Sequence, residues 1–195
     1  MGEGGKLIPL LPPSSEILCF GQAGPRTVQR GVEFSRDWGA GRAAGDGVLP
    51  ASLPWPEAAP VEEGAQLFLS FGDVPHPDYV EVRVYGRETD DSGLPTVAEP
   101  LSVLECRLTE PRREKRIRRW AGGVGVEMAL APGGVRRIAA WASWDVPLLH
   151  RRRLGLPEDT EDLQASWLFT LSTEPRSRNV PGSRTTLTPR SRPPS

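Results

Sequence analysis

The chain has few of the residues that most often build metal centres. Among its 195 residues there are only two histidines, two cysteines and two methionines. His76 and His150 lie far from any cysteine at the spacing of zinc ligands, and two methionines give little support to a soft-metal site. The acidic loops at 90–91 and 158–162 do not follow the calcium-loop pattern. The sequence therefore predicts no metal ion and no cofactor.

Signature motifs of enzymes are missing as well. There is no GxSxG elbow, no Walker A pattern and no cysteine in a sequence context known to activate a thiol. The glycine-rich run at 39–45 has the wrong spacing for a dinucleotide loop. A triad can assemble from distant residues, so a hydrolase with a dispersed site stays open as an alternative. The absence of motifs favours a non-enzymatic domain.

Long apolar runs are absent too. No stretch approaches the roughly 20 apolar residues of a membrane helix, and the apolar stretch at the N-terminus is too short for a signal peptide. As written, the sequence predicts a cytoplasmic chain, or one whose export signal lies outside it. The two cysteines, Cys19 and Cys106, could form a disulfide that closes a long loop, or could be two separate thiols.

The strongest fold signal is a pair of alternating segments at 135–144 and 165–171. Alternation with period two is typical of half-buried strands. It assigns these residues to the core: Ile138, Ala140, Ala142, Trp144, Ala165, Trp167, Phe169 and Leu171. Trp141 falls on the opposite face. Together with similar segments at 64–71, 80–84, 101–108 and 124–130, the pattern predicts an all-β, antiparallel, immunoglobulin-like sandwich.

The 21 glycines and 21 prolines indicate long loops around this core. We expect a flexible leader over 1–15, an irregular region with edge strands over 16–63, the sandwich over 64–172 and a disordered basic tail over 173–195. Within the irregular region, the LPWP segment at 53–56 could dock on the sheet as a plug. A short helix is predicted at 157–163, where a proline precedes several acidic residues.

The sharpest polar feature is a basic run at 112–119, directly before Trp120. Its cations are Arg112, Arg113, Lys115, Arg116, Arg118 and Arg119. Clustered cations could neutralise the phosphates of a polyanion, with Trp120 stacking on a base or covering a sugar. A charged loop between two strands, whose cations discourage aggregation, explains the same run without a ligand. Both readings fit the sequence.

Three parts of the chain resemble uncharacterised secreted lipoproteins of Gram-positive bacteria that carry a C-terminal immunoglobulin-like sandwich. They are GAQLFLSFG at 64–72, VEVRVY at 80–85, and the closing pair of segments at 138–144 and 166–171. The resemblance implies the sandwich fold and an extracytoplasmic location, and it implies no activity. The leading expectation is thus a non-enzymatic domain with a binding or structural role at the cell envelope. Polyanion binding through the basic run is the first alternative.

Overall fold

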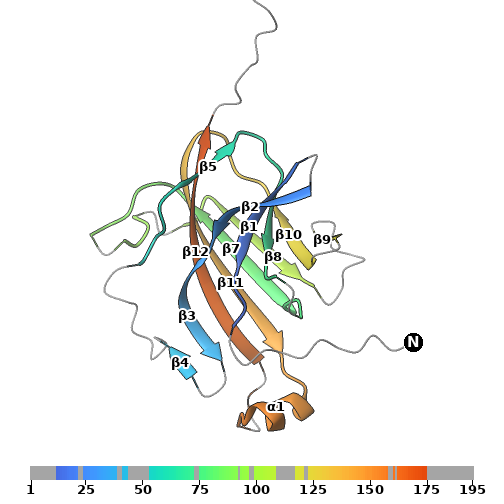
Figure 1. The fold of residues 1–195 in the computed structure, drawn as a ribbon. Coiled ribbons are helices and arrows are strands. Elements are labelled where there is room, and N and C mark those ends of the chain that lie inside the picture. The colour runs from blue at the N-terminus through green and yellow to red at the C-terminus, as the bar shows by residue number, and fades with distance from the viewer. Residues whose placement is uncertain are drawn as a thin grey trace, which may run out of the picture.

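In the computed structural model, two β-sheets face each other across one core (Figure 1). The structure describes residues 12–174, except for 22–23, 39–40, 44–52, 73–74, 92, 97–98, 109–116, 121–122, 158–159 and 161. The described residues form twelve strands and one short helix, so the all-β, sandwich-like prediction is confirmed. Most of the predicted leader and almost all of the predicted basic tail lie outside the described residues.

The first sheet is fully antiparallel and has the order β2-β1-β6-β10-β9. Its strands are β1 (Glu16–Gly21), β2 (Gly24–Arg30), β6 (Leu67–Ser70), β9 (Ile117–Trp120) and β10 (Gly123–Met128). The end of the basic run therefore continues into strand β9, which pairs with β10. The earlier part of the run lies outside the described residues.

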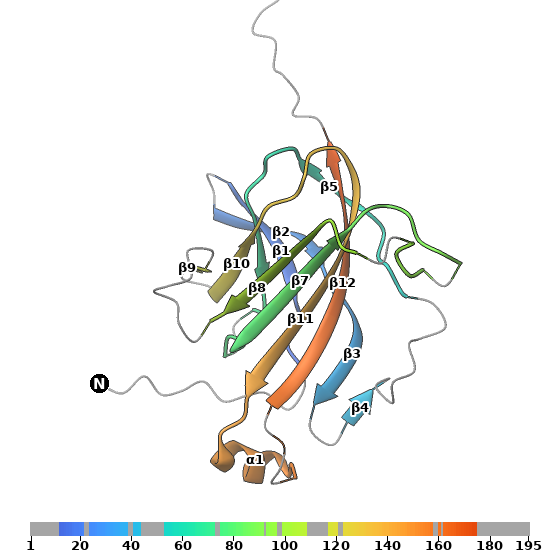
Figure 2. The ribbon, with the colours of Figure 1, turned by 180° about the vertical axis from the view of Figure 1, so that it is seen from behind.

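The second sheet has the order β4-β3-β12-β11-β7-β8, and β5 adds to β12 as a parallel strand. Its strands are β3 (Val32–Trp38), β4 (Gly41–Ala43), β5 (Ala59–Glu62), β7 (Tyr79–Tyr85), β8 (Ser102–Arg107), β11 (Gly134–Asp145) and β12 (Asp162–Glu174). Figure 2 shows β7, β11, β12 and β3 side by side as one curved surface. The two predicted closing segments pair along their whole length, with Ile138 opposite Phe169 and Ala140 opposite Trp167.

The core is made by the inward residues of both sheets. The first sheet contributes Ile17, Leu67, Leu69, Phe71, Val126 and Met128, and the second contributes Val80, Val82, Val84, Ile138, Ala140, Ala142, Trp144, Ala165, Trp167, Phe169 and Leu171. The predicted inward face of the closing pair is thus confirmed. Small alanines beside large aromatic rings allow the two layers to interdigitate at interior density.

Segment 16–38 contributes three strands to the sandwich, ahead of the predicted start at residue 64. β1 lies between β2 and β6, and β3 lies between β4 and β12, so neither is an edge strand. The chain passes from the first sheet to the second at Gly31, whose N–H donates to the Ser15 carbonyl at 2.8 Å. β3 pairs with β12 only as far as Val32, and the Gln29 side chain then accepts from the Thr170 N–H at 2.8 Å.

The helix lies earlier in the chain than predicted. α1 spans Leu148–Leu154 and ends at Gly155, whose left-handed backbone (φ 66°) and N–H cap the last turn. Three arginines lie in that turn, where their positive charges interact favourably with the negative, C-terminal end of the helix dipole. The prediction over 157–163 is wrong, because β12 already begins at Asp162. The alternating pattern of β12, whose buried residues begin at Leu163, outweighs the helix start signal at Pro157.

The two cysteines lie in opposite sheets, Cys19 in β1 and Cys106 in β8, and the structure has no disulfide between them. Cys106 is buried and belongs to the core cluster, while Cys19 is half-buried and packs against that cluster. The sequence left open either a disulfide or two separate thiols, and the structure contains two separate thiols.

Candidate functional site

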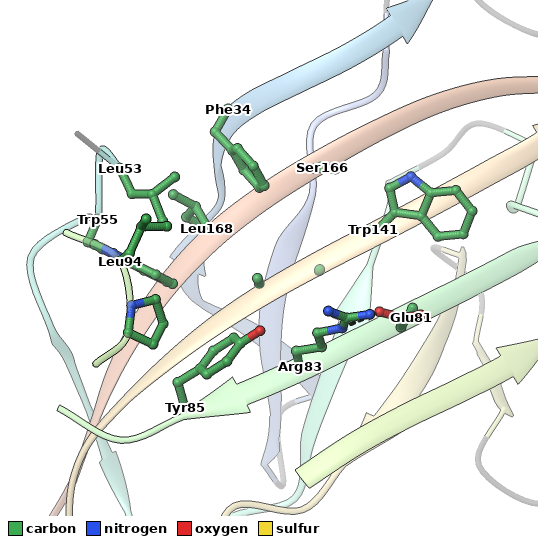
Figure 3. Close-up of a pocket in the computed structure, with 13 residues that line it drawn as sticks. Phe34, Leu53, Trp55, Glu81, Arg83, Tyr85, Leu94, Trp141, Ser166 and Leu168 are labelled. Carbon is green, nitrogen blue, oxygen red and sulfur yellow. Dashed lines mark hydrogen bonds and ion pairs between the residues drawn. The ribbon is translucent and has the colours of Figure 1, made fainter. Parts of the chain in front are cut away.

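A pocket opens on the outer face of the second sheet, away from the core. On β11, alternation places Arg137, Ala139 and Trp141 on this face. The register sets Ala139 between Arg83 of β7 and Leu168 of β12. Because a methyl group stands where the neighbours have long side chains, the sheet surface is hollow at this point. The resulting pocket has a volume of about 310 Å³ (Figure 3).

The pocket is lined mainly by apolar groups. Its residues are Phe34, Leu53, Trp55, Glu81, Arg83, Tyr85, Leu94, Pro95, Ala139, Ala140, Trp141, Ser166 and Leu168. Figure 3 shows Phe34 and Leu168 on one side, with Trp55 and Leu94 at one end and Trp141 at the other. Leu168 is fully buried although it points away from the core, so a second apolar layer covers this part of the sheet.

That layer includes the segment beginning at Leu53, so the predicted docking of the LPWP segment is confirmed. The Trp55 indole N–H donates to the Gly93 carbonyl at 2.6 Å. On the sheet below, the guanidinium carbon of Arg137 lies 5.4 Å from the Trp55 ring centroid. Gly93 has φ +80°, and a Cβ there would come within 3.2 Å of the Leu53 carbonyl oxygen. These contacts hold Trp55 in place as a preformed wall of the pocket.

Arg137 supports this wall from outside the lining. Burial lowers the pKa of its guanidinium, and the charge of Arg87 lowers it further. Its Nε and Nη1 atoms are buried and find no hydrogen-bond partner among the described residues. The electron-rich face of the Trp55 indole is a suitable neighbour for such a cation.

The side of the pocket formed by β7 is polar. Glu81, Arg83 and Tyr85 are successive outward residues of this strand, and Figure 3 shows them in a row. Arg83 Nε donates to Glu81 Oε1 in an ion pair whose glutamate side chain is 19% exposed and whose arginine is 52% exposed. The pKa of Arg83 is raised, first by this hydrogen bond and then by one with Tyr85. We refer to these three residues as the polar edge.

Trp141 closes the far end and packs edge-on against Tyr79, with ring centroids 5.4 Å apart. Burial raises the pKa of the Tyr79 phenol, and the neighbouring carboxylates of Glu105 and Glu81 raise it further. Tyr79 is therefore a neutral phenol at pH 7, and it supports the Trp141 ring as Arg137 supports Trp55. Both aromatic ends of the pocket are held by neighbours.

The titratable and hydroxyl groups of the lining come from Glu81, Arg83, Tyr85 and Ser166. The lining contains no histidine or cysteine, and the described residues hold no group of three or more His, Cys, Asp and Glu side chains that could bind a metal ion. His76 contacts the Pro77 carbonyl and His150 lies on α1, so neither belongs to the pocket.

The structure describes only part of the run predicted for polyanion binding. Arg112, Arg113, Lys115 and Arg116 lie outside the described residues, and Arg118, Arg119 and Trp120 belong to β9 in the other sheet. Sequence reasoning missed Glu81, Arg83 and Tyr85 as site residues. Their alternation with Val80, Val82 and Val84 marks them as outward-facing, but period two alone does not show that another segment docks on the same face of the sheet.

No known protein family, curated protein or solved structure matches the chain. Within the described part of the chain, there is no helix with the length and apolar character needed to span a membrane.

Proposed function

We propose that this chain is a non-enzymatic ligand-binding domain whose ligand occupies the outer-face pocket. The observation that supports this proposal most strongly is an apolar hollow with Ala139 at its floor. The hollow lies between Trp55, which its neighbours hold in place, and the polar edge. Ligand sites are typically concave, mostly apolar and preformed, with a few polar groups that fix orientation. A sheet needs no such hollow for stability, because filling it with a larger side chain would bury more apolar surface.

We further propose an immunoglobulin-like strand arrangement and a location at the cell envelope. Two mostly antiparallel sheets around one core support the first proposal. The second rests on the resemblance of segments 64–72, 80–85, 138–144 and 166–171 to secreted lipoproteins. Polyanion binding through the run at 112–119 stays a prediction without structural support.

Filling the hollow should abolish ligand binding and leave the fold intact. In Ala139→Phe, the new ring occupies the floor between Arg83 and Leu168, so we expect the affinity for N-phenyl-1-naphthylamine, a neutral apolar dye, to fall at least tenfold. The measurement is a fluorescence titration of the full chain, accompanied by thermal unfolding. Val135→Phe is the matched control, because Val135 is half-exposed on the same face of β11 but outside the pocket. Equal dye affinity in the two variants would refute the proposed site.

A further inference from the structure

We infer that the ligand is a saccharide, bound through a pyranose ring that lies between the apolar side of the pocket and the polar edge. This inference rests on the proposed function and narrows it to one chemical class. It follows from the charge of the polar edge, from the opposite character of the two sides, and from the cost of covering the edge with an apolar ligand.

The polar edge favours a neutral ligand. Glu81 and Arg83 form one ion pair at the pocket, so a ligand carboxylate attracted by the guanidinium would be repelled by the adjacent carboxylate. A ligand ammonium attracted by the Glu81 carboxylate would be repelled by the Arg83 guanidinium. A neutral diol avoids both problems, since one hydroxyl can donate to Glu81 while its neighbour accepts from Arg83. The Tyr85 phenol and the Ser166 hydroxyl extend the set of polar partners along the pocket.

The two sides of the pocket match the two surfaces of a sugar ring. A pyranose presents C–H groups on its faces and hydroxyl groups around its rim. The C–H groups suit Phe34 and the aromatic ends of the pocket, because aromatic faces carry negative charge density. The hydroxyl rim suits the row of Glu81, Arg83 and Tyr85 on the opposite side (Figure 3). A flat molecule with one apolar surface and one hydroxylated edge satisfies both sides together.

An acyl chain fits less well, although it would suit the apolar side. Glu81 is already largely buried beside Arg83, and an aliphatic ligand lying along β7 would remove the remaining water from both groups. Covering polar atoms without new hydrogen bonds is unfavourable, because their hydrogen bonds to water are lost and not replaced. A saccharide replaces the displaced water with its own hydroxyls. The polar edge thus discriminates between these ligand classes.

The test is a titration of the full chain with four tetrasaccharides, built from β-linked glucose, α-linked glucose, mannose and N-acetylglucosamine, and with decanoate. The indole N–H signals of Trp55 and Trp141 are followed by NMR and assigned with tryptophan variants. We expect at least one tetrasaccharide to shift both signals saturably, with a Kd of about 1 mM or tighter, the weak end of specific binding. Glu81→Gln should weaken that binding at least tenfold, because a neutral amide replaces the carboxylate acceptor.

Glu33→Gln is the matched control, since Glu33 is also a strand glutamate paired with an arginine (Arg36, 3.4 Å) but lies outside the pocket. It should bind the sugar as the unmodified chain does. If no tetrasaccharide moves the two indole signals, or if Glu81→Gln binds with unchanged affinity, the saccharide inference is overturned. Dye or decanoate binding that depends on Ala139 would then leave the proposed pocket standing. If neither class binds, the proposed function fails together with the inference.

Discussion

Replacing Trp144 by alanine is expected to lower the free energy of unfolding by about 3–5 kcal/mol, the range for removing a large aromatic side chain from a core. Trp144 is 1% exposed and lies at the centre of an aromatic cluster. Its ring centroid is 5.0 Å from that of Trp38, 5.7 Å from that of Phe71 and 6.3 Å from that of Trp167. Because these neighbours come from β3, β12 and the end of β6, they cannot all collapse into the space left behind.

The indole of Trp144 also donates to the Pro75 carbonyl at 2.8 Å, which ties the loop before β7 to the core. Trp144→Phe keeps most of the ring and loses this bond, so it should cost less, about 1–2 kcal/mol for the orphaned carbonyl and the smaller volume. Urea unfolding followed by circular dichroism measures both variants. Trp141→Ala is the matched control, since it removes the same residue type from the opposite face of the same strand. A loss for Trp144→Ala no larger than that for Trp141→Ala would contradict this description of the core.

The different roles of the tryptophans show what sequence patterns can and cannot predict. Trp144 and Trp167 are in phase with apolar neighbours, and period two was enough to assign them to the core. The same phase placed Trp141 on the outer face, where it lines the pocket. Trp38 gave no such signal, because it ends a strand whose neighbours are polar and glycine-rich. It is nevertheless 4% exposed, buried by its contact with Trp144.

The pocket could be predicted only in part, because its sides come from distant parts of the chain. Outward-facing residues on β7 and β11 follow from alternation, and the LPWP segment suggested a docked plug. The pairing of Trp55 with Gly93 and Arg137 joins residues 38 and 82 positions apart. Leu168 illustrates the same limit: alternation marks it as outward-facing, yet it is fully buried beneath the second layer. Local periodicity identifies faces of a strand, whereas tertiary contacts decide which faces are covered.

Segment 16–38 carries a weaker sequence signal, because short strands with bulges interrupt the alternating pattern. The pairing register shifts between Ile17 and Leu18 in β1, and again between Ser166 and Trp167 where β3 meets β12. Each bulge moves the following side chains to the other face, so a single period cannot describe the segment. Local sequence patterns also do not predict that the chain passes from one sheet to the other at Gly31. The crossing depends on close contact with residues of β12, far along the chain.

That crossing leads to the second large effect: Gly31→Ala should destabilise the protein by about 1–3 kcal/mol, as overpacking of a close-packed site usually does. A Cβ at this position would lie 2.7 Å from Phe169 Cζ, 2.9 Å from Phe169 Cε1 and 2.9 Å from Trp167 Cβ. Phe169 is fully buried, and the Trp167 Cβ can move only with the β12 backbone. The crossing chain would have to lift from the sheet, which would also strain the 2.8 Å bond between the Gly31 N–H and the Ser15 carbonyl.

Gly86→Ala is the matched control, because a Cβ at Gly86 meets nothing within 4 Å and the residue lacks a positive φ. Its stability should be unchanged or raised by about 0.4–1 kcal/mol through the lower entropy of the unfolded chain. A double-mutant cycle with Phe169→Leu then isolates the clash. Since the shorter side chain makes room for the new methyl group, Phe169→Leu should cost less in the Gly31→Ala background than in the unmodified protein. If urea unfolding shows that Gly31→Ala is as stable as Gly86→Ala, β2 and β3 do not cross over Phe169 as closely as the structure indicates.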